Sequence, residues 1–162
     1  MTDAPEGAKA RLIRDDADAD TPIRVEHFVL CERATVDKDR KPHLVAPMTR
    51  MEVTNLPGRV AELGVYVDFW GAPFGTHKVR FEITGPPGSN EYEDPGQLDA
   101  ELDTHGRCGV LLGFKEVTFT KEGVHTLAIL LEGVVPGHVT VLAKRNFEVV
   151  QAIGTTWGTG SL

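Results

Sequence analysis

The stretch GVYVDFWGAPFGTHKVRFEITGPPG, residues 64–88, decides the fold class because two runs in and beside it alternate between apolar and polar side chains. Apolar side chains take every second position of both runs: Leu63, Val65, Val67 and Phe69 in the first, Val79, Phe81 and Ile83 in the second. A period of two is typical of strands with one face on a core and one in water. Gly71, Pro73 and Gly75 separate the runs, so we expect the runs to pair as a hairpin through residues 71–76.

The rest of the chain continues the β pattern on both sides of this stretch. Residues 23–32 read as a strand, residues 33–46 as a hairpin with a polar turn, and residues 110–150 as several further strands. In the last strand the apolar positions are expected to share one face: Val139, Val141, Ala143 and Phe147. Helix signals are nearly absent after Pro22. We therefore expect an all-β protein, an antiparallel immunoglobulin-like β-sandwich of roughly seven to ten strands, with a barrel as the alternative.

Residues 85–109 interrupt the alternation with six acidic residues, five glycines and three prolines. One reading is a short helix of two turns, capped by Asp94 and started by Pro95, with Leu98 and Leu102 on its buried side. The other reading is a loose loop with a short hairpin. A loop of this length in a compact domain is often functional or mobile.

The composition divides the chain into one domain and two tails. Residues 1–21 are acidic and hold few large apolar side chains, which predicts a disordered N-terminal tail. Residues 22–151 form the predicted β-sandwich domain, and residues 152–162 a flexible C-terminal tail. A chain of 162 residues can bury a core without a disulfide or a structural metal.

The net charge of −7 argues against nucleic acid and against anionic membranes as partners. No apolar run approaches the ~20 residues of a membrane helix, and the N-terminus lacks the order of a secretory signal. We expect a cytoplasmic protein. Cys31 and Cys108 form no CxxC motif, and Cys31 lies in an apolar run, which favours a small core residue. Cys108 lies in an expected loop, where a role as a nucleophile would need a base such as His105.

Two segments carry a resemblance to a known family. The first is VEHFVLCERATVDKDRKPHLVAP, with the pattern F-x-L-C-x-x-A-x-V in residues 28–36 and a return strand that begins with Lys41. Together with the stretch at 64–88 and the final strands, it resembles a family of small bacterial β proteins known only as a domain of unknown function. The resemblance covers residues 24–150. That family usually has Gly before the lysine, where this chain has Arg40.

The last third is also similar to generic immunoglobulin-like sandwiches. The similarity lies in residues 123–127, with His125 near the position where such folds often place Tyr, and in residues 142–149. Both resemblances imply a β-sandwich, and neither supplies catalytic residues to transfer.

The candidate contact surface consists of Tyr66, Trp70, Phe74 and His77, which flank the turn of the opening stretch. Exposed aromatic patches of this kind serve protein or sugar contacts. The alternative is that Trp70 and Phe74 form a hydrophobic corner that covers the core.

Metal and catalytic motifs are missing. No two of the six histidines stand at a ligand spacing, so no metal site is predicted; the weak candidates are His27 and His125, whose strands could adjoin, with a loop acid. The two serines, Ser89 and Ser161, lie in a turn and in the tail, and no cofactor motif occurs, so no cofactor is predicted.

These absences favour a non-enzymatic protein-interaction or structural module, with a protein partner or a homo-oligomer as its assembly. One alternative is a small-ligand or metal-binding protein, or an enzyme, that uses a His/Asp/Glu site. The other alternative is a component of a phage-like or other large assembly.

Overall fold

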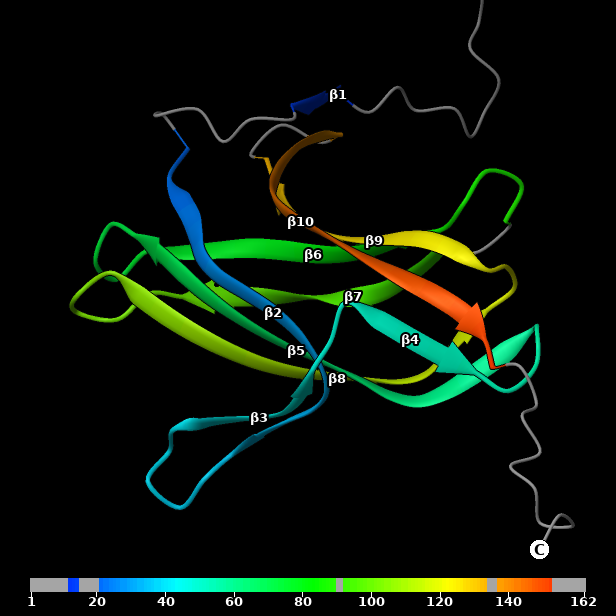
Figure 1. Cartoon of the computed structure of the whole chain (residues 1–162). Coiled ribbons are helices and arrows are strands. Elements are labelled where there is room, and N and C mark those ends of the chain that lie inside the picture. The colour runs from blue at the N-terminus through cyan, green and yellow to red at the C-terminus, as the bar shows by residue number, and fades with distance from the viewer. Residues whose placement is uncertain (1–11, 15–20, 90–91, 134–136, 153–162) are drawn as a thin grey trace, which may run out of the picture.

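The computed structural model describes residues 12–14, 21–89, 92–133 and 137–152, and every regular element in them is a β-strand (Figure 1). The strands are β1 (Leu12–Arg14), β2 (Ile23–Val36), β3 (Pro42–Pro47), β4 (Arg50–Val53), β5 (Gly58–Gly71), β6 (Thr76–Thr84), β7 (Tyr92–Glu101), β8 (Arg107–Phe119), β9 (Gly123–Glu132) and β10 (His138–Gln151). The all-β prediction is therefore confirmed. No helix occurs among these residues, and so none there could cross a bilayer.

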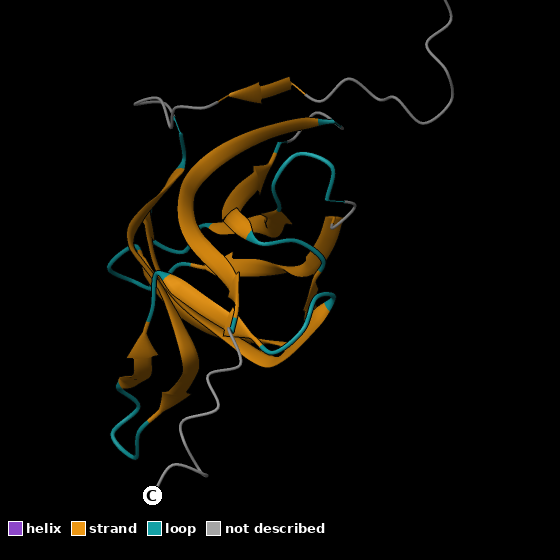
Figure 2. Ribbon diagram, turned by 45° about the vertical axis from the view of Figure 1, so that its right-hand side comes forward, coloured by secondary structure: helices purple, strands orange, loops and turns teal. Residues whose placement is uncertain are grey.

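The strands form two sheets. One has four strands in the order β3-β2-β5-β8; the other has six, in the order β1-β10-β9-β6-β7, with β4 also paired to β10. The six-stranded sheet is strongly curled, because β10 bends through a wide arc (Figure 2). The expectation of a wholly antiparallel fold is wrong, since β1 and β4 both run parallel to β10.

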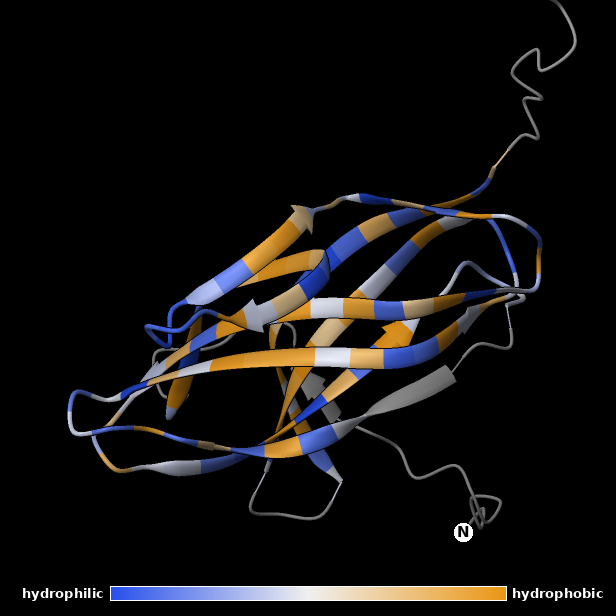
Figure 3. Ribbon diagram, turned by 90° about the horizontal axis from the view of Figure 1, so that it is seen from below, coloured by the Kyte–Doolittle hydropathy of each residue, from blue (hydrophilic) through white to orange (hydrophobic). Residues whose placement is uncertain are grey.

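The core lies between the sheets and uses the faces that the alternation predicts. Alternating bands of apolar and polar residues run along the strands (Figure 3). The side chains at the predicted inward positions of β5 and β6 are all buried: Leu63, Val65, Val67, Phe69, Val79, Phe81 and Ile83. Phe81, 1% exposed, packs its ring against Phe114 of the opposite sheet with 5.6 Å between centroids. Period-two alternation thus identified the buried faces correctly.

The predicted hairpin between the two runs is wrong. The first run is β5, which pairs with β2 and β8, and the second is β6, which pairs with β7 and β9. The segment between them crosses from one sheet to the other. Alternation records which side of a strand is buried, and that pattern is the same for strands paired by their edges and for strands packed face to face.

The acidic segment at 85–109 holds a strand where the sequence suggested a short helix or a loop. β7 (Tyr92–Glu101) pairs antiparallel with β6 and forms an edge of the six-stranded sheet. The register shifts between Phe81 and Ile83, opposite Gly96, whose φ is +123°. An edge strand tolerates Pro95 and a glycine bulge because only one of its sides must pair.

The faces of β10 are not continuous, contrary to the sequence expectation. A bulge between Val141 and Ala143 shifts the register against β9. Ala143 and Phe147 face the main core, whereas Val139 and Val141 join a separate small cluster. One inserted residue reverses the side of every later position, so the simple alternation fails across the bulge.

Both predicted tails fall largely outside the described residues. In the N-terminal segment 1–21, Leu12–Arg14 forms β1 and pairs with His138–Thr140 of β10. In the C-terminal segment 152–162 only Ala152 is described, and its backbone N–H donates to the carbonyl of Val53 at 2.8 Å.

Candidate functional site

The four predicted contact residues divide between one sheet face and one turn. Tyr66 and Trp70 stand on the face of β5 that points away from the core, since the buried positions of that strand are the odd ones. Phe74 lies in the turn between β5 and β6, and His77 is the second residue of β6. Trp70, Phe74 and His77 thus lie near the same end of the molecule, while Tyr66 lies one step further along β5.

Tyr66 belongs to a polar cluster on the outer face of the four-stranded sheet. Its hydroxyl donates to Oδ1 of Asp68 at 2.5 Å, and Nδ1 of His27 lies 3.0 Å from Oδ2 of the same carboxylate. His27 and Asp68 are direct register partners on β2 and β5. Asp68 was missed by sequence reasoning, because only the pairing of these two strands brings it to His27.

Burial raises the pKa of Tyr66 to about 12, and the hydrogen bond to Asp68 and its negative charge act in the same direction. Gly109 of β8 faces this pair, and a Cβ at that position would lie 3.3 Å from Oδ1 of Asp68. The glycine therefore leaves room for the tyrosine and carboxylate to lie flat on the sheet. A tyrosine held neutral in this way offers a contact surface and no nucleophile at neutral pH.

Trp70 is covered on one side by an arginine. The guanidinium carbon of Arg107 lies 3.9 Å from the ring centroid, a cation–π geometry. Arg24 on β2 and Arg107 on β8 are the two register partners of Trp70, so the ring lies between two exposed arginines in an acidic protein. The sequence offers no signal for this grouping, since the three residues come from three separate strands.

The turn that carries Phe74 is tied to the loop between β7 and β8. The N–H of Phe74 donates to the carbonyl of Asp103 at 3.1 Å, and the N–H of Leu102 donates to the carbonyl of Gly75 at 2.8 Å. The N–H of Gly71 donates to the carbonyl of Gly106 at 2.9 Å. Three backbone bonds across two loops make this corner a fixed platform.

Asp103 organises the loop that supports the turn. Its carboxylate accepts the backbone N–H groups of Arg107 at 3.0 Å and His105 at 2.7 Å. These two donors lower the pKa of Asp103. Gly106 has φ +73° and approaches the carbonyl of Gly71 so closely that a side chain there would collide with it. The geometry of this loop therefore depends on both a carboxylate and a glycine.

Phe74 is the most exposed large apolar side chain that the structure describes, at 75%. Its φ is +61°, a left-handed conformation that disfavours residues other than glycine, asparagine and aspartate. Phe74 thus combines an unfavourable backbone conformation with unfavourable exposure of an aromatic ring to water. Such outliers cluster at functional sites.

His77 and the two weak metal candidates do not assemble. A Cβ at Gly75 would lie 2.9 Å from Nε2 of His77, so that imidazole lies back over its own turn. His27 lies on the four-stranded sheet and His125 on the six-stranded sheet, so their strands are not neighbours. Within the described ranges no group of three His, Cys, Asp or Glu residues is placed to hold a metal ion.

His125 is a core residue. It is fully buried, edge-on to Phe119 at 5.0 Å and stacked on Phe147 at 5.7 Å between ring centroids. Its Nδ1 lies 3.1 Å from the carbonyl oxygen of Gly123. Its position among aromatic rings matches a packing role.

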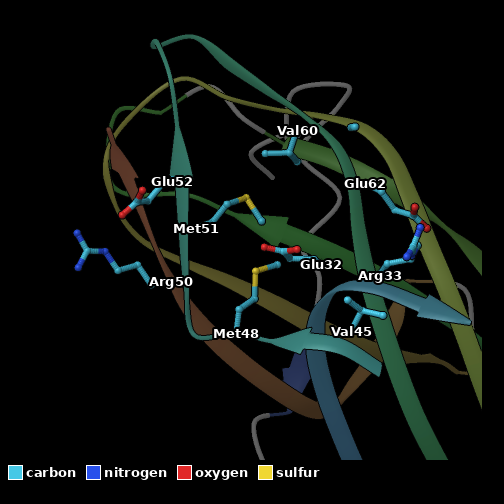
Figure 4. Close-up of a pocket in the computed structure, with 10 residues that line it drawn as sticks. Glu32, Arg33, Val45, Met48, Arg50, Met51, Glu52, Val60 and Glu62 are labelled. Carbon is cyan, nitrogen blue, oxygen red and sulfur yellow. The ribbon is translucent and has the colours of Figure 1, made fainter. Parts of the chain in front are cut away.

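A cleft of about 730 Å³ opens at the other end of β5 (Figure 4). It forms where β2 leaves β5: these strands pair only as far as Cys31 and Gly64, after which β2 continues into its hairpin with β3. After β3 the chain continues into β4, which pairs with β10 of the other sheet. A gap therefore remains between β2, β4 and the start of β5. The lining residues are Glu32, Arg33, Val45, Met48, Arg50, Met51, Glu52, Val60, Ala61 and Glu62.

Among the acidic side chains that line the cleft, Glu62 is paired with a basic residue and, within the described ranges, Glu32 is not. Glu62 bonds to Lys115 at 3.0 Å, and Figure 4 shows Arg33 beside Glu62 and Arg50 directed away from the cleft. Glu32 points toward the middle, near the side chains of two methionines (Figure 4). In the described part of the chain the carboxylate of Glu32 has no hydrogen bond or ion pair. No motif or spacing in the sequence singles out this carboxylate.

Both cysteines are free thiols. Desolvation raises the pKa of Cys31 and also the pKa of Cys108, so neither is activated toward a thiolate. Sequence reasoning placed Cys31 in the core, and it is fully buried.

These features define the class: an all-β domain of two sheets, with Trp70 and Phe74 at one end of β5 and a methionine-lined cleft at the other. In sequence, residues 26–143 match the family of unknown function DUF6941. The chain belongs to that family, and this confirms the coarser part of the resemblance, a domain of unknown function over most of the chain. No curated protein matches the chain in sequence.

Solved structures give distant similarities. A β-glucosidase from Listeria innocua in complex with glucose is 10% identical, with a TM-score of 0.44 over 77% of this chain and 16% of that chain. The β-glucosidase from Listeria innocua in complex with isofagomine is 11% identical, with a TM-score of 0.44 over 92% and 20%. A family 123 glycoside hydrolase from Clostridium perfringens is 13% identical, with a TM-score of 0.37 over 78% and 28%. This chain spans less than a third of each, and scores this low support no inference about activity.

Proposed function

We propose that this protein is a non-enzymatic interaction module that acts in the cytoplasm by contact with another protein. Its contact surface, the aromatic corner, consists of Tyr66, Trp70, Phe74, His77 and Arg107. The observation that carries the proposal is Phe74, which is 75% exposed at φ +61° on a turn held by backbone bonds. Strain and exposure at one fixed position are expected where an aromatic side chain serves as an anchor for a partner.

The chemistry of the corner indicates what a partner must present. Phe74 requires an apolar recess. Arg24 and Arg107 on either side of Trp70 favour carboxylates at the rim of that recess, since both arginines are exposed and unpaired with a described acid. The partner surface is therefore apolar at its centre and acidic at its edge.

We also infer that the domain is an immunoglobulin-like sandwich. The orders β2-β5-β8 and β10-β9-β6 in the two sheets support this, because they correspond to the orders A-B-E and G-F-C of that fold. Such domains commonly bind other proteins through loops at one end of the sandwich, where the aromatic corner lies.

The test is site-specific photo-crosslinking. A photoreactive phenylalanine analogue replaces Phe74 in cells that make the protein, and the matched control places it at Val36, which is also exposed, at 55%, but lies on the β2–β3 hairpin. We expect an adduct at position 74 that is absent at position 36 and is lost when Arg107→Glu is added. Equal labelling at both positions, or none at 74, would contradict the proposal.

A further inference from the structure

We propose that the partner of the aromatic corner is a second copy of this chain, and that Phe74 of one copy docks into the cleft between β2, β4 and β5 of the next. The inference rests on the proposed function and names its partner. The molecules would then associate head to tail, with one corner and one cleft used in each contact.

The apolar surfaces of corner and cleft are complementary. Val45, Met48, Met51 and Val60 line the cleft, whose volume of about 730 Å³ accepts an aromatic side chain together with part of its turn. Methionine side chains adapt to an inserted ring, and sulfur–aromatic contacts are favourable. Phe74 is the protruding aromatic side chain of the described residues that can fill such a recess.

The charges are complementary as well. Glu32 points toward the middle of the cleft and pairs with no described residue (Figure 4). Arg24 and Arg107 flank Trp70 beside the turn. A docked corner brings an arginine to the carboxylate of Glu32 beside the apolar contact, which favours one orientation over others.

The positions of the two surfaces exclude contact within one molecule. The cleft includes Val60–Glu62 near the start of β5, whereas Phe74 follows the end of that strand at Gly71. Ala72 lies ten positions after Glu62 along the chain, which at the rise of a β-strand is roughly 30 Å. Backbone bonds from Asp103 and Gly106 hold the turn in place. The contact is therefore between copies. Where each copy inserts its corner into the next and not back into the same neighbour, the contact is heterologous and produces rings or filaments.

The backbone of β5 offers a further bonding surface in the cleft. Between Gly58 and Gly64, β5 pairs with β8 along one edge. Along its other edge, where β2 pairs from Gly64 onward, no strand of the described chain pairs with this part of β5. An incoming turn can therefore bond to main-chain groups near Ala61 in addition to filling the apolar recess.

The experiment measures the mass of the purified full-length protein by light scattering and sedimentation velocity across a concentration series. Phe74→Asn removes the anchor and keeps a residue that accepts positive φ. Glu32→Arg reverses the charge in the cleft. The matched controls are Val36→Asn and Glu26→Arg, both at exposed positions of β2 outside the cleft lining. Circular dichroism verifies that all four variants fold.

We expect the wild type and both controls to grow beyond a dimer as concentration rises, and each test variant alone to be a monomer. In an equimolar mixture of the two test variants, Phe74→Asn keeps an intact cleft and Glu32→Arg keeps an intact corner. The mixture should therefore form a one-to-one dimer and nothing larger. Assembly that survives either substitution, or a mixture that stays monomeric, would overturn the head-to-tail contact.

A monomeric wild type separates this inference from the proposed function. If the wild type stays monomeric and the photo-adduct at position 74 contains another protein, the head-to-tail inference is overturned and the contact function of Phe74 stands. If the wild type is monomeric and position 74 gives no adduct, both are overturned.

Discussion

The guanidinium carbon of Arg107 lies 3.9 Å from the centre of the Trp70 ring and thereby joins β8 to β5 at the corner of the molecule. Arg107 also donates its backbone N–H to Asp103, whose carbonyl in turn accepts the N–H of Phe74. The residue therefore connects the aromatic ring of the sheet to the loop that supports the exposed anchor.

Replacing the Arg107 side chain tests this connection. We expect Arg107→Ala to lower the free energy of unfolding by about 0.5–1 kcal/mol, the value of a partly exposed cation–π contact. Urea denaturation followed by tryptophan fluorescence in a Trp157→Phe background measures it. The matched control is Arg24→Ala on the other side of the ring, for which we expect a smaller loss; equal losses would argue against a specific contact.

The buried face of β6 is tested by Phe81→Ala. Phe81 is 1% exposed and packs on Phe114, so we expect the free energy of unfolding to fall by about 3–5 kcal/mol. Phe74→Ala makes the same truncation at an exposed position and should lose less than about 1 kcal/mol. Chemical denaturation of the two variants side by side gives the comparison, and a loss below about 1 kcal/mol for Phe81→Ala would place Phe81 on the wrong face.

Tyr66 provides a titration test on the outer face of the four-stranded sheet. Its pKa is raised to about 12, so the unfolded chain, with a tyrosine pKa of about 10, loses the proton first as pH rises. The contribution of Tyr66 to stability is complete below about pH 10 and is lost between about pH 10 and 12. Phenolate absorbance in a Tyr92→Phe background should show this pKa directly.

Asp68→Asn is the partner variant for that titration. It removes the negative charge beside the Tyr66 hydroxyl, so the pKa of Tyr66 should fall toward its ordinary value while burial keeps it somewhat raised. The control is His27→Gln, because His27 contacts the same carboxylate from β2. This substitution should change the pKa of Tyr66 less than Asp68→Asn does. An unchanged titration in Asp68→Asn would show that the carboxylate does not act on the tyrosine.

Asp103 should determine part of the acid sensitivity of the corner. The N–H groups of Arg107 and His105 lower its pKa, so its contribution to stability is present above about pH 4 and is lost as pH falls through the lowered pKa. Asp103→Ala should remove that dependence and speed amide exchange of Phe74 and Gly71, whose N–H groups bond to this loop. Exchange rates that match the wild type at both amides would contradict the role of Asp103.

The β2–β3 turn contains a second residue with a positive φ. Arg40 has φ +60°, and the turn is closed by the N–H groups of Asp39 and Lys41, which donate to Oδ1 of Asp37. Arg40→Gly relieves the left-handed strain, partly offset by the greater freedom of glycine in the unfolded chain. We expect a net gain of about 0.5–1 kcal/mol by thermal or urea unfolding; Arg40→Ala keeps the strain and should show no gain.

Alternation along single strands allowed much of the core to be predicted. The inward positions of β5 and β6 follow from a period of two, as does the hairpin of β2 and β3 from a polar turn between two apolar runs. The candidate contact residues Trp70 and Phe74 were found in the same way, because aromatic residues beside Gly and Pro stand out in a turn.

The remaining features depend on pairing between strands that are distant in sequence. Arg107 meets Trp70 and His27 meets Asp68 only because β8, β5 and β2 lie in register. The cleft around Met48 exists because β2 and β4 belong to different sheets. No local pattern records these partners, so the sequence could not predict which arginines flank Trp70, or that the carboxylate of Glu32 pairs with no residue of the described ranges.

The sequence by itself determined that this is an all-β chain, which side of β5 and of β6 is buried, and that Trp70 and Phe74 stand beside the turn between them. Only the tertiary structure decided that residues 71–76 cross between sheets, that a bulge after Val141 reverses β10, and that an edge strand takes the place of a helix at β7. The physical reason is that side-chain burial is a local property of each strand, whereas pairing is decided by the packing of the whole core.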